Sequence, residues 1–160
     1  MPLEQTSISF PDPDKILLDR NAQAGYRCNC CGQFVKIYTR KLNSSMAQVL
    51  ILIYRSGKTD YFHVEDYLKS LNKASLRADF HKLRYWGLLK KKIENREDNS
   101  PRNGFYRITP SGIMFVESKI QVKEAVLIFN NEFMGFSGND VSIDECLGRK
   151  FSYSELMGTV

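Results

Sequence analysis

Apolar residues recur at helical spacing in three consecutive segments, which we predict to be helices over residues 43–55, 64–71 and 73–86. The first segment has its apolar stripe at the spacing i, i+3, i+4, i+7, on Met46, Val49, Leu50 and Ile53. The third segment has an inner stripe on Leu76, Phe80 and Leu83. Three helices are therefore expected to follow one another with short connections.

Local signals mark the ends of the predicted helices. Ser45, with Gln48 three residues later, fits a capping box at the start of the first helix. Gly87 suits the position just after the third helix. Thr109 followed by Pro110 predicts an N-cap and the first turn of a fourth helix, which should run to about residue 118.

Strand patterns surround this helical region. Residues 88–93 and 105–108 predict two strands joined by a polar loop, and residues 125–129 and 132–136 predict a second hairpin with a two-residue turn. The expected class is α+β. We predict an irregular arm over 1–25, a knuckle and strand over 26–42, a main domain over 43–121, and a hairpin-helix appendage over 122–160 that ends in two short helices.

Composition limits the classes of protein that this chain can belong to. Of its 160 residues, 42% are hydrophobic and 26% are charged, as in ordinary globular proteins. The longest apolar run is too short to span a bilayer, and the N-terminus lacks the pattern of a secretory signal. We therefore expect a protein of the cytoplasm that does not enter the membrane.

Charge is distributed unevenly along the chain, whose formal net charge is +5. Residues 69–107 contain 11 Lys/Arg and 4 Asp/Glu, whereas residues 124–160 contain 2 Lys/Arg and 6 Asp/Glu. A basic middle and an acidic tail indicate a localised surface that binds polyanions.

The positive residues fall on the predicted third helix and on the hairpin that follows it. An exposed helix face with small side chains can approach the major groove of DNA, while lysines and arginines on a hairpin can contact phosphates. The candidate DNA-binding residues are Lys73, Ser75, Arg77, Ala78, His81, Lys82 and Tyr85 on the helix, and Lys90, Lys91, Lys92, Arg96 and Arg102 on the hairpin. The alternative interpretation is a solvated, charged surface without a ligand.

Ordered sequence motifs within residues 43–118 resemble the MarR-like winged helix-turn-helix pattern. They are Ser-Leu at 75–76, Leu83, Gly-Leu-Leu at 87–89, and Tyr-Arg-Ile-Thr-Pro-Ser-Gly at 106–112. The resemblance implies a winged helix-turn-helix fold and a sequence-specific transcriptional regulator that binds double-stranded DNA. Such domains usually bind as dimers, so a homodimer is expected.

The whole chain also resembles small uncharacterised proteins of bacteriophages and prophages. The shared features are the CxxCGQ run that starts at Cys28, residues 38–44 (Tyr-Thr-Arg-Lys-Leu-Asn-Ser), residues 135–138 (Gly-Phe-Ser-Gly) and residues 155–157 (Glu-Leu-Met). This resemblance implies a phage or prophage setting and no particular activity.

The cysteines form a candidate metal site. Cys28 and Cys31, followed by Gly32, have the spacing of half a zinc ribbon, in which backbone N–H groups point at two thiolates. A closed structural zinc site needs four ligands, and Cys30 or Cys146 could contribute, as could His63 or His81. The alternative is a turn of reduced thiols without metal.

No enzyme motif is complete in this sequence, so we expect a protein without catalytic activity. Residues 56–59 (Ser-Gly-Lys-Thr) end like a phosphate-binding loop, but the required earlier glycine is replaced by Leu52. The main alternative to a DNA-binding regulator is an interaction module that binds or inhibits a host protein. Binding of single-stranded nucleic acid or double-stranded RNA is not favoured, because no exposed aromatic pair lines the basic face.

Overall fold

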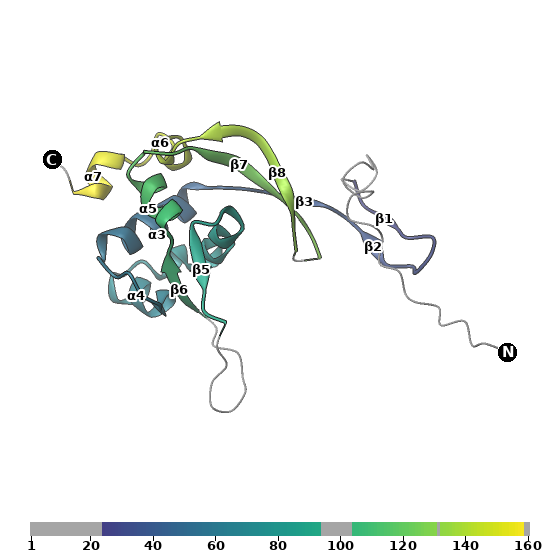
Figure 1. Cartoon of the computed structure of the whole chain (residues 1–160), viewed down its shortest axis with the longest axis horizontal. Coiled ribbons are helices and arrows are strands. Elements are labelled where there is room, and N and C mark those ends of the chain that lie inside the picture. The colour runs from purple at the N-terminus through teal and green to yellow at the C-terminus, as the bar shows by residue number, and fades with distance from the viewer. Residues whose placement is uncertain (1–23, 94–103, 131, 159–160) are drawn as a thin grey trace, which may run out of the picture. The chain divides into compact units, whose positions relative to one another are not determined.

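The structure is a computed structural model that describes residues 24–93, 104–130 and 132–158. It combines helices with small antiparallel sheets, which confirms the expected α+β class (Figure 1). Among the described residues, every helix is too short or too polar to cross a lipid bilayer. Residue contacts divide the chain into a larger unit, within residues 41–124 and 138–160, and a smaller unit, within residues 1–40 and 125–137.

The larger unit contains most of the helices and one three-stranded sheet. Its elements in chain order are α3 (Ser44–Arg55), β4 (Phe62–His63), α4 (Val64–Ser70), the 3₁₀ helices η1 (Ala74–Ala78) and η2 (Phe80–Trp86), β5 (Leu89–Lys91), β6 (Phe105–Ile108), α5 (Pro110–Val116), α6 (Ile143–Leu147) and α7 (Tyr153–Met157). The sheet has the order β4-β6-β5, and both pairings are antiparallel.

The smaller unit is built on strands. It contains β1 (Tyr26–Arg27) paired with β2 (Phe34–Val35), and a small core of Val35, Ile37 and Phe129. A three-stranded sheet of order β3-β7-β8 includes residues of both units, and its strands are β3 (Tyr38–Lys41), β7 (Val122–Phe129) and β8 (Glu132–Val141).

Helix α3 is the central element of the larger unit. Its N-cap is Asn43, whose Oδ1 accepts a hydrogen bond from the Met46 backbone N–H at 2.9 Å. The capping box predicted from Ser45 is therefore wrong, although the helix starts where expected. The buried face of α3 is also wider than the predicted apolar stripe, because Ala47, Gln48 and Ile51 are buried as well. The reason is that α5, α6, α7 and both 3₁₀ helices contact α3.

The segment after the β5–β6 hairpin confirms the predicted cap of the fourth helix. Thr109 Oγ1 accepts a hydrogen bond from the Gly112 N–H at 3.0 Å and donates one to the Gly87 carbonyl at 2.5 Å. Helix α5 therefore begins at Pro110, and it ends at Val116, two residues before the expected end. A Cβ at residue 112 would collide with the Leu88 carbonyl oxygen, which explains why this position needs glycine.

The C-terminal helices pack on α3 within the larger unit. Arg55 Nη1 donates a hydrogen bond to the Leu156 carbonyl at 3.0 Å, and the Tyr153 hydroxyl donates one to the Val116 carbonyl at 2.6 Å. This division differs from the sequence-based one, in which residues 122–160 form one appendage. Two helices of five residues each cannot bury an apolar face alone, so Ile143 and Leu147 are buried by packing in the larger unit.

Candidate nucleic-acid interface

The predicted third helix is the first part of the candidate interface, and it differs from the expectation. Residues 73–86 form two short 3₁₀ helices with a break at Asp79, not one continuous α-helix. In a 3₁₀ helix, residues three apart lie on one face. Phe80, Leu83 and Trp86 have this spacing and are all buried. Trp86 was not predicted to be in the core, and its indole N–H donates to the Lys123 carbonyl at 2.7 Å.

This change of helix type rearranges the side chains that face solvent. With three residues per turn, His81 and Arg84 share one row of side chains beside the buried face of η2. Lys82 and Tyr85 share the other row. Arg84 is half-buried, with its guanidinium 5.1 Å from the centroid of the Tyr85 ring. Sequence reasoning missed Arg84, and the three-residue spacing of the apolar residues is the signal that could have found it.

The start of the segment is open to solvent. Lys73, Ser75, Arg77 and Ala78 are exposed or only partly buried, and no residue of η1 is buried. The predicted inner residue Leu76 is only partly buried. These positions therefore remain accessible to a ligand.

Lys82 has a partner within its own segment. Its Nζ lies 2.6 Å from Asp79 Oδ1, and this hydrogen bond holds the pKa of the Asp79 carboxyl below its usual value. Part of the positive charge predicted for the interface is therefore neutralised before any ligand binds.

His81 is half-buried beside Phe80. Burial lowers the pKa of the His81 imidazole, and the nearby positive charges of Lys82 and Arg84 lower it further. At neutral pH the ring is therefore neutral, so it can contact a ligand through hydrogen bonds but adds no charge.

The hairpin β5–β6 supplies the second part of the candidate interface. Lys90 is exposed and lies directly opposite Arg107 in the register of the two strands. The Arg107 guanidinium lies 5.2 Å from the centroid of the Tyr61 ring, and Lys92 Nζ lies 5.8 Å from the same ring. Lys91 is half-buried, opposite Tyr106. Neither Arg107 nor Tyr61 was predicted, because their places beside Lys90 and Lys92 depend on contacts between separate segments.

Like charges that lie directly opposite each other in a sheet destabilise it. A negatively charged partner would offset the repulsion between Lys90 and Arg107. Within the described ranges, no ion pair joins Lys73, Arg77, Lys90 or Arg107 to a carboxylate. Arg96 and Arg102, predicted at the tip of this hairpin, lie outside the described residues. The described part of the surface thus has four exposed or partly exposed cations without an acidic partner.

The cysteine turn lies between β1 and β2. The Cys28 N–H donates to the Gln33 carbonyl at 2.8 Å, and the Gly32 N–H donates to the Cys28 carbonyl at 2.9 Å. Backbone N–H groups of Cys31 and then Cys30 lower the pKa of the Cys28 thiol, as the knuckle spacing implies. Among the described residues, no group of three or more His, Cys, Asp or Glu side chains is arranged to hold a metal ion. The zinc site stays a prediction.

Cys146 belongs to the larger unit and differs chemically from the turn cysteines. Burial raises the pKa of its thiol to about 12, and the charges of Glu145 and Glu124 act in the same direction. Because zinc binds the thiolate, this environment disfavours Cys146 as a ligand. His63, another candidate ligand, has a structural role. Its Nδ1 accepts a hydrogen bond from the Asp66 N–H at 3.2 Å, so the side chain caps the start of α4.

Comparison of the chain with protein-family models, curated proteins and solved structures finds no match. Its function must therefore be inferred from its own residues.

Proposed function

We propose that this protein is a sequence-specific transcriptional regulator that binds double-stranded DNA through a winged helix-turn-helix. The order of elements in the larger unit supports the proposal: helix, strand, three further helical segments, then a hairpin and a helix. The resemblance to phage and prophage proteins supports a phage or prophage setting. In this mechanism, residues 73–86 approach the major groove and the β5–β6 hairpin contacts phosphates.

The observation that carries the proposal is the cross-strand pair of Lys90 and Arg107. Two adjacent cations without a described acidic partner form a site for phosphate oxygens, and Arg77 adds an exposed guanidinium on η1. Phosphate contacts of this kind provide affinity and orientation, whereas groups such as Arg77 can read base edges.

Fluorescence anisotropy with a labelled duplex of random sequence tests the phosphate contacts. The double variant Lys90→Gln/Arg107→Gln should weaken binding, and the slope of log K against log salt should fall by about 0.9 for each phosphate that is no longer neutralised. The matched control is Arg149→Gln/Lys150→Gln, which removes two exposed positive charges from the loop between α6 and α7 and should behave as the wild type. Equal binding by both double variants would contradict the proposal.

Selection of bound DNA from a random pool tests base reading. Wild-type protein should enrich a defined sequence, and Arg77→Gln should relax the preference at one or two positions, with a loss of about 1–3 kcal/mol on the selected site. Recovery of no enriched sequence would leave only nonspecific binding and would overturn the assignment as a regulator.

An interaction module that binds a host protein is the second candidate function. Two observations favour it: Lys82 is already paired with Asp79, and the large apolar side chains Leu71 and Met114 are exposed on the larger unit. Under this alternative, duplex binding is weak and does not respond to Lys90→Gln/Arg107→Gln.

A further inference from the structure

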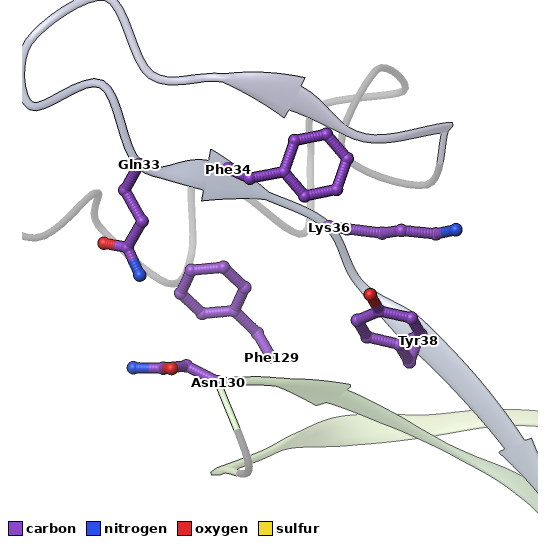
Figure 2. A pocket seen from close by; sticks show the side chains of 6 residues that line it. All are labelled: Gln33, Phe34, Lys36, Tyr38, Phe129 and Asn130. Carbon is purple, nitrogen blue, oxygen red and sulfur yellow. The ribbon is translucent and has the colours of Figure 1, made fainter.

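The smaller unit contains a pocket whose chemistry differs from that of the basic surface. The pocket has a volume of about 130 Å³ and is lined by Gln33, Phe34, Lys36, Tyr38, Phe129 and Asn130 (Figure 2). Pockets that enclose whole small-molecule ligands measure roughly 300–1,000 Å³. This one therefore has room for a single flat ring and not for a complete cofactor.

Aromatic rings form a large part of the pocket wall. Phe129 is buried in the small core with Val35 and Ile37 and is therefore fixed. Phe34 is 53% exposed, which is unusual for a ring of this size next to a core. In Figure 2, the rings of Phe34 and Phe129 lie between the amides of Gln33 and Asn130 on one side and Lys36 with Tyr38 on the other.

Gly25 allows Phe34 to occupy this place. A Cβ at residue 25 would lie 2.5 Å from Phe34 Cζ, so any other residue would push the ring away. The backbone at Gly25 has φ of +88°, a region that side chains with a Cβ rarely adopt. The position of the exposed ring thus depends on a glycine at this site.

Positive charge lies beside the Tyr38 ring of the pocket. Lys36 Nζ is 5.1 Å and the Arg40 guanidinium carbon 5.5 Å from the centroid of the Tyr38 ring, which is itself 44% exposed. None of the six described lining residues carries a carboxylate. Residues 24–40 contain Arg27, Lys36 and Arg40 and no acidic residue.

We propose that this pocket binds an unpaired base of single-stranded nucleic acid, with Phe34 as the stacking ring. An exposed ring next to cations is the combination that binds single strands, since the ring stacks on a base and the cations contact the backbone. The amides of Gln33 and Asn130 can donate to and accept from the base edge. A duplex cannot use this pocket, because its base faces are stacked inside the helix.

A purely apolar protein partner would leave the lysine, arginine and amide groups of this site without a role. The sequence did not favour single-strand binding, because no aromatic pair lines the basic helix and hairpin. The exposed rings of Phe34 and Tyr38 lie instead in the smaller unit, and the proposal does not depend on duplex binding by the larger one.

Fluorescence anisotropy of the full chain with short labelled strands of oligo(dU), oligo(rU) and an abasic deoxyribose polymer tests this site. Both base-containing strands should bind more tightly than the abasic strand, because stacking needs a base. Stronger binding to one of the two identifies DNA or RNA as the preferred source of the base. Equal binding of all three strands would overturn the proposal, since it would leave only phosphate contacts.

The decisive variant is Phe34→Ala, compared with Phe133→Ala as a matched control. Phe133 is an exposed phenylalanine of the same unit, at 45%, and does not line the pocket. Removal of a stacked ring should weaken strand binding roughly fivefold or more, whereas the control should bind as the wild type. The variant Phe34→Tyr keeps a ring and should restore binding.

Two further measurements separate this site from the DNA-binding proposal and from unfolding. Lys36→Gln, which keeps the core intact, should lower the salt dependence of strand binding by about one phosphate contact. Phe34→Ala should leave duplex binding unchanged, and Lys90→Gln/Arg107→Gln should leave binding of the unpaired base unchanged. If Phe34→Ala and Phe133→Ala bind single strands equally, the pocket is not the site.

Discussion

The two units of this protein differ in the number of apolar residues that each buries. In the larger unit, α3 buries seven of its twelve residues and is contacted by helices from distant parts of the sequence. The small core of the other unit is the cluster of Val35, Ile37 and Phe129, and Ala125, Val126 and Ile128 are also buried in that unit. Four of the eight large hydrophobic side chains that are exposed in the described part of the chain belong to the smaller unit: Phe34, Tyr38, Phe133 and Phe136.

This difference shows where a ligand can gain from contact with the protein. A ring that is already buried contributes to folding, whereas an exposed ring loses water only when a ligand covers it. The larger unit offers a basic surface, whereas the smaller unit contains four of the five exposed large aromatic side chains in the described part of the chain. The two proposed activities, duplex binding and single-base binding, therefore use different physical forces.

The largest expected effect comes from the core of the larger unit. Leu50 is fully buried in α3, so Leu50→Ala should lower the free energy of unfolding by about 2–5 kcal/mol, because it removes buried apolar surface and leaves a cavity. Urea denaturation followed by circular dichroism measures it. The exposed residue Lys69 on α4 provides a control, since Lys69→Ala should change this free energy by no more than about 0.5 kcal/mol.

Val35→Ala tests whether the smaller unit opens independently of the larger one. Val35 is fully buried there, and its truncation should cost about 2 kcal/mol. Because so few residues support this core, the expected result is faster hydrogen exchange at residues 26–38, with exchange in α3 unchanged. Equal acceleration in α3 would show that the two units unfold together.

Removal of the α3 cap should have an effect of about 1 kcal/mol. Asn43→Ala leaves the Met46 N–H without its side-chain acceptor and should lower the thermal midpoint. Ser45→Ala tests the cap that the sequence predicted and should have a smaller effect, because Ser45 lies inside the helix. A larger loss of stability for Ser45→Ala would contradict the assigned cap.

The smallest effect on stability is expected from the Asp79–Lys82 pair. The pKa of Asp79 is lower in the folded state, so its contribution is present at neutral pH and is lost as the pH falls through that lowered value. The pair is partly exposed, so Asp79→Asn should cost less than about 1 kcal/mol at pH 7. The stability difference from wild type should disappear in acid, as thermal unfolding across pH would show.

The same substitution distinguishes the ligands of the two units. Asp79→Asn releases Lys82 from its ion pair and should strengthen duplex binding in the anisotropy assay. Binding of an unpaired base in the smaller unit should stay the same. Weaker duplex binding would mean that Asp79 positions Lys82 for DNA and does not compete with it.

Helix starts and the hairpins could be predicted because their signals are local. Thr109 before Pro110 correctly marked the start of α5, and the second strand of the first hairpin matches the predicted 105–108. The third helix was not predicted in its true form. Its sequence fits α-helical and 3₁₀ spacing, and the burial of Trp86 against a segment 37 residues away selects the 3₁₀ form.

The residues of the candidate sites also fall into two groups, those that the sequence predicted and those that it missed. Lys90 and Arg77 were found because charge and periodicity are visible in the sequence. Arg107, Tyr61 and the pocket around Phe34 were missed, because each depends on a register or contact that brings separate segments together.

Near neighbours along the chain were enough to establish the α+β class, most of the helix starts and the location of the basic segment. Long-range packing was needed to establish the helix type of residues 74–86, the contacts of α6 and α7 with α3, and the pairing of β3 with β7. The physical reason is that burial is a property of the whole fold. A local pattern can show that a residue is apolar, but not which distant segment covers it.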